Sequence, residues 1–129
     1  MSLDISLKQK ENGVYVISPA GSLDSTTCQL LDDEIEKIIK IKASTVVLDL
    51  EDLKFMSSMG VGLINRTKSR LKEQGGEFAM VNLQPQITKV FEIMSLLPTM
   101  NVFNDDDELD EYLGKIQQRI TEDGTSLGS

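Results

Sequence analysis

The chain has 129 residues, of which 40% are hydrophobic and 26% charged, and this size and composition are typical of one soluble globular domain. The net charge of -8 disfavours binding to nucleic acid or to an anionic membrane, because both need a basic protein surface. One cysteine allows no internal disulfide, and the absence of histidine excludes serine–histidine and cysteine–histidine nucleophiles within this chain.

The sequence also bears on location and cofactors. It has no basic segment followed by an apolar run at the N-terminus, and no apolar run near the roughly 20 residues that span a bilayer. Without histidine, and with one cysteine, the usual zinc ligand sets are excluded. We therefore expect a cytoplasmic protein with no metal site and no cofactor.

The first part of the chain predicts a β-hairpin and a helix. Residues 3–7 alternate between apolar and polar, which is typical of an edge strand, and residues 11–13 form a turn signal. A second strand is expected from Val14 to Ile17, stopped by Pro19 and Gly21. Helix-capping residues follow, and residues 26–41 carry apolar side chains at helical spacing.

The middle of the chain predicts a buried strand and a second helix. Residues 44–50 are a short β-branched run of the kind found in the centre of a parallel sheet. Ser57 and Ser58 open a helix that Gly75 and Gly76 end. Its basic residues are expected on the solvent side; they are Arg66, Lys68, Arg70 and Lys72.

The last part predicts a strand at 77–83, a helix that starts near Pro85, a short strand at 101–103 and a final helix. Alternating strands and helices imply an α/β fold, here a mixed, mostly parallel sheet with an N-terminal hairpin and helices packed mainly on one face. We expect one domain over residues 1–115. Residues 116–129 are expected to be the end of the last helix and, after Asp123, a disordered tail.

The most informative segment is 46–64, where a buried strand leads into the helix that begins at the two serines. Gly60 and Gly62 both lie in the first turns of this helix, although each glycine costs a helix about 1 kcal/mol relative to alanine. Two glycines there are explained if another backbone or a partner approaches closely, or if the turn must flex.

A serine at a helix start has two interpretations. It can cap the helix by accepting a backbone N–H, and one of the two serines is expected to do so. It can also accept a phosphate, which adds about -1.5 to -2 charges at the positive end of the helix dipole. Such a dianion would leave the helix intact and would hinder a partner that docks on it.

Three segments in order and spacing resemble the STAS domain family, and within it the anti-sigma factor antagonists. They are residues 21–24 (GSLD), residues 46–50 with 55–62 (VVLDL and FMSSMGVG), and residues 75–77 (GGE) with the amphipathic segment 84–97. Where the family pattern has aspartate and serine, this chain has Ser57 and Met59. The resemblance covers about residues 3–115 and implies the STAS fold.

The resemblance implies a binding switch and not an enzyme. A partner anti-sigma factor, which is a serine kinase, would phosphorylate Ser58 and thereby lose its binding site, and a phosphoserine phosphatase would reset the protein. Ser57 is the second candidate acceptor. The protein is expected to be a monomer or a weak dimer. The implied contact surface, called the partner patch below, consists of Ser22, Asp24, Ser57, Ser58, Met59, Gly60, Val61 and Gly62.

Two alternatives stay open on the residues alone. Ser57 in place of the family aspartate favours a STAS scaffold or complex subunit that binds through the same patch without phosphorylation. A nucleotide could instead bind at the helix start beside Ser58, although the chain has no Gly-rich phosphate-binding motif.

Overall fold

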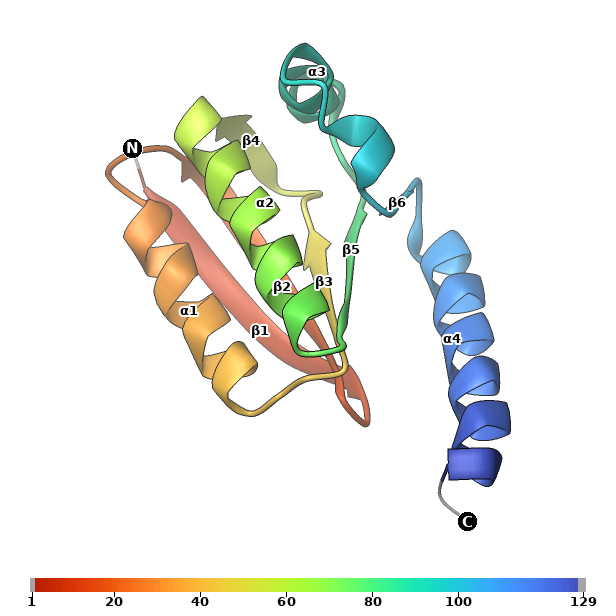
Figure 1. Ribbon diagram of the computed structural model, residues 1–129. Helices are drawn as coiled ribbons and strands as arrows, with labels where there is room; N and C mark the ends of the chain where they lie inside the picture. The colour runs from red at the N-terminus through yellow and green to blue at the C-terminus, as the bar shows by residue number, and fades with distance from the viewer. Residues whose placement is uncertain (1, 128–129) are drawn as a thin grey trace.

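The computed structural model describes residues 2–127, and the side chains of residues 2–116. Strands and helices alternate along the chain (Figure 1). In chain order they are β1 (Leu3–Glu11), β2 (Val14–Leu23), α1 (Cys28–Lys40), β3 (Thr45–Asp49), β4 (Leu53–Met56), α2 (Ser58–Glu73), β5 (Glu77–Val81), α3 (Pro85–Ile93), the 3-10 turn η1 (Leu97–Thr99), β6 (Val102–Phe103) and α4 (Asp106–Leu127).

The described strands form one six-stranded mixed sheet in the order β1-β2-β3-β5-β6, with β4 paired to β2. The hairpin β1–β2 is antiparallel, and every other pairing is parallel. The predicted hairpin and mixed sheet are therefore confirmed. The strand β2 is long enough to pair with β3 along its first half and with β4 along its last residues.

The central strands β3 and β5 each carry a continuous apolar run because both of their faces are covered. In β3, Val46 and Leu48 belong to one buried cluster, while Val47 between them belongs to another. In β5, Phe78 and Ala79 divide in the same way. Successive side chains on a strand point to opposite faces, so a strand buried on both sides carries a continuous apolar run.

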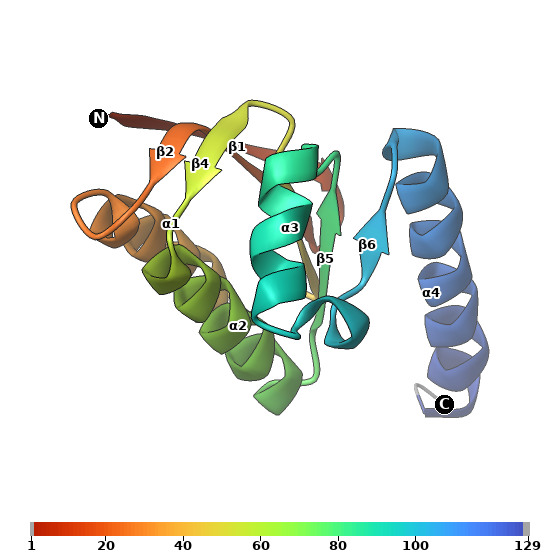
Figure 2. The same cartoon turned by 90° about the horizontal axis from the view of Figure 1, so that it is seen from above.

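The helices α1, α2 and α3 cover one face of the sheet, and α4 stands apart from them (Figure 2). Leu31 of α1, Ile64 of α2 and Phe91 of α3 are fully buried in the cluster on that face. Leu109 and Leu113 of α4 belong to the cluster on the other face. The sequence analysis placed the first three helices together on one face, and this is confirmed.

Two strand predictions are corrected by the structure. The strand β2 does not end at Pro19 but continues to Leu23. Pro19 falls between Ile17, the last residue paired with β3, and Gly21, the first paired with β4, where a residue without an N–H removes no ladder bond to a parallel neighbour. The strand β4 was not predicted, because its four residues show no alternation and are held by non-local pairing with β2.

The C-terminal helix is longer than expected. The helix α4 runs to Leu127, so residues 124–127, for which disorder was expected, are helical, while the domain boundary after residue 115 stays a prediction. Glycine at position 124 costs the helix about 1 kcal/mol but removes no backbone donor, so the helical ladder can continue. Residues 128 and 129 lie outside the described residues.

Burial of α4 gives a stability prediction. Leu113 is 3% exposed against the second face of the sheet. We expect Leu113→Ala to lower the free energy of unfolding by about 2–4 kcal/mol, because the lost methyl groups leave a cavity. The control Leu7→Ala removes a side chain that is 42% exposed and should cost less than about 1 kcal/mol. Urea denaturation measures both, and equal losses would contradict the packing assigned to α4.

Candidate functional site

The end of β2 and the start of α2 lie side by side, although more than 30 residues separate them in the sequence. Parallel pairing places Leu23 opposite Met56, and the next residue, Ser57, donates its backbone N–H to the carbonyl of Leu23 at 2.9 Å. The turn that follows β2 and the first turn of α2 therefore form one surface, as the partner patch requires.

The two serines at the start of α2 have different environments. Ser57 is the N-cap residue in an extended conformation, and its hydroxyl accepts the N–H of Gly60 at 3.3 Å. Ser58 is the first helical residue and is exposed, and no described residue hydrogen-bonds to its hydroxyl. The expected division is confirmed in that one serine, Ser57, caps the helix. The hydroxyl of Ser58 is left facing solvent.

Asp24 is held in a tight turn beside these serines. Its Oδ1 accepts the backbone N–H of Thr26 at 2.9 Å and the hydroxyl of Thr26 at 2.6 Å. These hydrogen bonds from Thr26 keep the pKa of Asp24 below its ordinary value, because they stabilise the ionised carboxylate. The turn is tied to β2 by the buried hydroxyl of Thr27, which donates to the carbonyl of Ser22 at 2.8 Å.

The threonines that position Asp24 were missed by the sequence analysis. Aspartate followed by hydroxyl residues two and three positions later is the signal that could have found them, since such sequences form side-chain-stabilised turns. Local spacing alone indicated helix caps at the serines and aspartate before α1, and the family resemblance added Ser22 and Asp24 to the partner patch. In the structure the N-cap residue of α1 is Thr27, and its side chain makes no capping bond.

The two glycines of α2 serve different purposes. A Cβ on Gly60 would lie 3.0 Å from side-chain atoms of both Leu23 and Met56, which are buried. Gly60 is therefore required for the close packing of α2 on β2 and β4. A Cβ on Gly62 would meet no atom within 4 Å, and Gly62 is exposed. Packing within the domain therefore explains the first glycine and leaves the second unexplained.

The members of the partner patch are close together but unequally accessible. Ser58, Met59 and Gly62 are exposed, and Asp24 and Ser57 are half-buried. The remaining three residues are buried; they are Ser22, Gly60 and Val61. The side chain of Val61 is fully buried, so it can shape the surface but cannot itself contact a partner.

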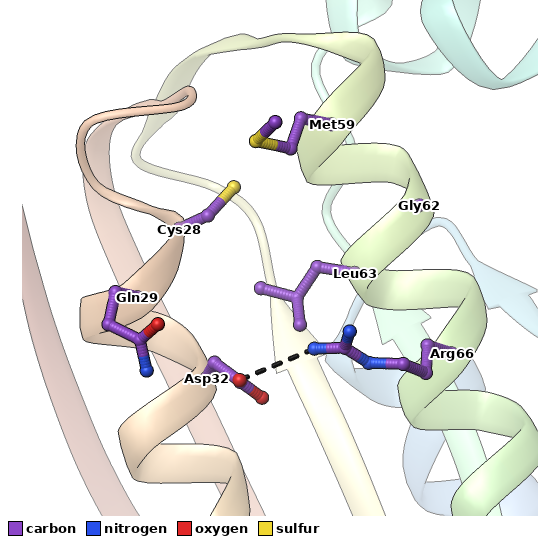
Figure 3. A pocket seen from close by; sticks show the side chains of 7 residues that line it. All are labelled: Cys28, Gln29, Asp32, Met59, Gly62, Leu63 and Arg66. Carbon is purple, nitrogen blue, oxygen red and sulfur yellow. Dashed lines mark ion pairs between the residues drawn. The ribbon is translucent and has the colours of Figure 1, made fainter.

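A groove of about 410 Å³ opens between α1 and α2 (Figure 3). Met59 and Gly62 of the partner patch line it on the α2 side. Sequence reasoning missed the other lining residues, which are Cys28, Gln29, Asp32, Leu63 and Arg66. Cys28 is half-buried at this groove. Burial, helped by the charges of Asp24 and Asp32, raises its pKa, so the thiolate is disfavoured.

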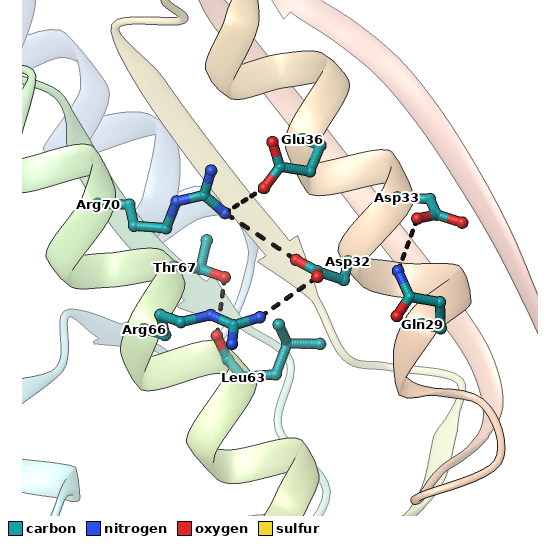
Figure 4. Close-up of polar contacts among 8 residues, drawn as sticks. All are labelled: Gln29, Asp32, Asp33, Glu36, Leu63, Arg66, Thr67 and Arg70. Carbon is teal, nitrogen blue, oxygen red and sulfur yellow. Dashed lines mark hydrogen bonds and ion pairs between the residues drawn. The ribbon is translucent and has the colours of Figure 1, made fainter.

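Ion pairs join α1 to α2 below the groove (Figure 4). Arg66 contacts Asp32 at 3.3 Å, and Arg70 contacts Glu36 at 2.6 Å and Asp32 at 4.0 Å. The hydrogen bond from Arg70 lowers the pKa of Glu36. Two of the basic residues expected on the solvent side of α2 therefore bridge to the neighbouring helix, and their charges are compensated inside the domain.

Comparison with known proteins is consistent with this geometry. The family model of the STAS domain matches residues 6–109. The chain belongs to the STAS domain family. The resemblance read from the sequence is thereby confirmed, and the match includes the turn at Asp24, both serines and the glycines of α2.

Similar proteins cover most of this STAS domain. It is 30% identical over 113 residues to an anti-sigma F factor antagonist of Lysinibacillus sphaericus, a match that spans 87% of this chain and 97% of the relative. The structure of the anti-sigma factor antagonist SpoIIAA in its unphosphorylated form has a TM-score of 0.74 and 28% identity, over 86% of this chain and 97% of that one.

SpoIIAA, described as a Bacillus cell fate determinant, is also known in a phosphorylated form. That structure matches this STAS domain with a TM-score of 0.67 and 27% identity, over 84% of this chain and 99% of the other. Among the described residues of the STAS domain, no helix is long and apolar enough to cross a membrane. The same residues include no cluster of three or more acidic or cysteine side chains placed to hold a metal ion.

The different environments of Ser57 and Ser58 give a prediction. Ser57→Ala should lower the free energy of unfolding by about 1 kcal/mol, because the N–H of Gly60 loses its cap. Ser58→Ala removes an exposed hydroxyl and should change stability by less than about 0.5 kcal/mol. Urea denaturation of both variants is the measurement. A larger loss for Ser58→Ala than for Ser57→Ala would reverse the assigned roles.

A second prediction concerns the charge on Asp24. Thr26→Val removes a hydroxyl donor to the carboxylate, so the pKa of Asp24 should rise toward the ordinary value of about 3.9. Because the folded-state pKa is lowered, this turn contributes stability above the ordinary pKa and loses it as the pH falls through the lowered value. Carboxyl ¹³C NMR titration measures the change.

Ser25→Ala is the matched control, since it alters an exposed neighbour in the same turn. The carboxyl titration of Asp24 should be the same in Ser25→Ala as in the parent protein. If Thr26→Val also leaves it unchanged, the hydroxyl of Thr26 does not hold the carboxylate in solution.

Proposed function

We propose that this protein is an anti-sigma factor antagonist, which binds a kinase-type anti-sigma factor through the partner patch and is released when Ser58 is phosphorylated. The observation that carries the proposal is the exposed, uncommitted hydroxyl of Ser58 at the N-terminus of α2, beside the Asp24 turn. The names of the curated relative and of SpoIIAA support the partner class, and the phosphorylated SpoIIAA structure supports the modification.

Ser58 is a better acceptor than Ser57 because of what their hydroxyls already do. The hydroxyl of Ser57 is half-buried and accepts the N–H of Gly60, so its phosphorylation would disrupt the cap. The hydroxyl of Ser58 is exposed and can enter a kinase active site without any local unfolding. This choice does not depend on the aspartate that the family pattern has and this chain lacks at position 57.

Electrostatics explain how one phosphate would act as a switch. The first turn of α2 contains no acidic residue, so a dianion at Ser58 gains from the helix dipole and the fold tolerates it. Across the patch lies the ionised carboxylate of Asp24. Phosphorylation would therefore enlarge a negative surface, and a partner that had matched one carboxylate would face an additional unpaired dianion.

The proposal includes the wider properties expected from the sequence. The protein acts in the cytoplasm as a kinase substrate and not as an enzyme, and it needs no cofactor. A phosphoserine phosphatase restores the binding form. The net charge of -8 fits a protein partner better than nucleic acid or an anionic membrane.

The test uses the kinase-type anti-sigma factors encoded in the same genome, each purified and mixed with this protein and ATP. We expect one of them to transfer phosphate to Ser58, located by peptide mass spectrometry, and Ser58→Ala to abolish the labelling. In calorimetry without ATP turnover, Ser58→Asp should weaken binding at least about tenfold, because the partner then buries an unpaired charge. Ser69→Asp, on an exposed serine farther along α2, is the matched control and should bind normally.

The alternatives give different results in the same experiment. Tight binding without labelling, and with normal affinity of Ser58→Asp, would assign the chain to the scaffold hypothesis. Failure of every such kinase to bind would reject the proposal. Heat released on titration with ATP or GTP alone, and lost in Ser58→Asp, would favour the nucleotide-binding hypothesis instead.

A further inference from the structure

Gly62 has an unexplained cost in this fold. It lies inside α2, where glycine is about 1 kcal/mol less favourable than alanine. A Cβ at this position would meet no atom within 4 Å, so the domain's own packing does not require glycine. At Gly60, two residues earlier, a Cβ would instead lie 3.0 Å from neighbouring side-chain atoms, which is a tight contact. The absence of a side chain at Gly62 therefore leaves open space at the surface of α2, where another molecule can approach the helix backbone.

The space beside Gly62 belongs to the groove between α1 and α2, because Gly62 is one of the residues that line this groove (Figure 3). Gly62 lies between Met59 and Arg66 on the α2 wall, and Cys28 faces Met59 across the mouth. The side chain of Met59 is 56% exposed, although it is apolar. The groove is continuous with the partner patch, because Met59 and Gly62 belong to both.

Some polar groups along the groove have partners within the domain, whereas the buried Oδ1 of Asp32 accepts no hydrogen bond from a described residue. Asp32 is bound by Arg66, and the amide of Gln29 donates to Asp33 at 2.8 Å. The thiol of Cys28 is kept neutral by its raised pKa. At the Met59 end of the groove, an apolar side chain would be buried against Met59 and Leu63.

We propose that this groove receives an apolar side chain of the anti-sigma factor, and that Gly62 is the point at which the partner comes closest to α2. The inference rests on the proposed function and adds the chemistry of the contact. We expect the partner segment to carry a basic residue as well, because the carboxylate of Asp24 lies in the partner patch and the whole chain has a net charge of -8. Flexible methionine suits such an apolar contact.

The test fills the groove without harming the fold. Gly62→Ala and Gly62→Leu add side chains where a Cβ has free space, and both should raise the melting temperature by about 2–5 °C through better helix propensity. Both should weaken binding to the purified anti-sigma factor, Gly62→Ala by about tenfold and Gly62→Leu more, because the added atoms occupy the partner's space.

Gly114 provides the matched control. It is an exposed glycine within α4, and a Cβ there also meets no atom within 4 Å. Gly114→Ala and Gly114→Leu should give the same thermal stabilisation and normal binding. A second pair tests the apolar contact itself: Met59→Ser should weaken binding about tenfold, whereas Ile41→Ser, which alters a side chain 59% exposed at the far end of α1, should not.

The outcomes separate this inference from the proposed function. Normal binding of Gly62→Leu, with Ser58→Asp still weakened, overturns the groove contact and leaves the phosphorylation switch standing. Absence of binding by the parent protein to every kinase-type anti-sigma factor rejects both. Self-association in sedimentation that Gly62→Leu abolishes would place a second copy in the groove and overturn the inference as well.

Discussion

The surface that contains Ser58 depends on the parallel pairing of β4 with the end of β2. That pairing sets Leu23 against Met56 and lets the backbone of Ser57 bond to the carbonyl of Leu23. Without it, the turn at Asp24 and the start of α2 would be two unrelated loops. Gly60 belongs to the same constraint, because a Cβ there would lie only 3.0 Å from side-chain atoms of Leu23 and Met56, one on each strand. A four-residue strand thus fixes the relative position of the residues proposed to bind a partner.

Local signals in the sequence were sufficient for most of the fold. Continuous apolar strands, helical stripes and glycine stops predicted the central elements, and family motifs predicted the two segments that meet at Ser58. The misses have a common cause in non-local contacts. Pro19 is tolerated inside β2 only because β3 has ended and β4 has not begun, and β4 itself exists only through its pairing with β2. Neither condition can be read from neighbouring residues.

The site was predicted in the same uneven way. The sequence predicted that the serines and Asp24 belong to one patch. It did not predict which members are exposed and can contact a partner, and which, like the buried Val61, only shape the surface. The groove could not be foreseen, because it arises from the distance between α1 and α2 and not from any motif. The distance between α1 and α2 also lets Arg66 and Arg70, which were expected on the solvent side, form ion pairs with Asp32 and Glu36 of the neighbouring helix.

The distribution of charge explains why a switch at this place need not disturb the fold. The ion pairs between α1 and α2 compensate the charges of Asp32 and Glu36, and the hydroxyl of Ser57 satisfies the backbone N–H of Gly60. A charge added at Ser58 then has no internal partner to displace. The added charge therefore changes the binding free energy of a partner that docks against Asp24, Met59 and the groove. Ser57 contributes to the stability of the fold through its capping hydrogen bond, whereas the exposed Ser58 is left for regulation.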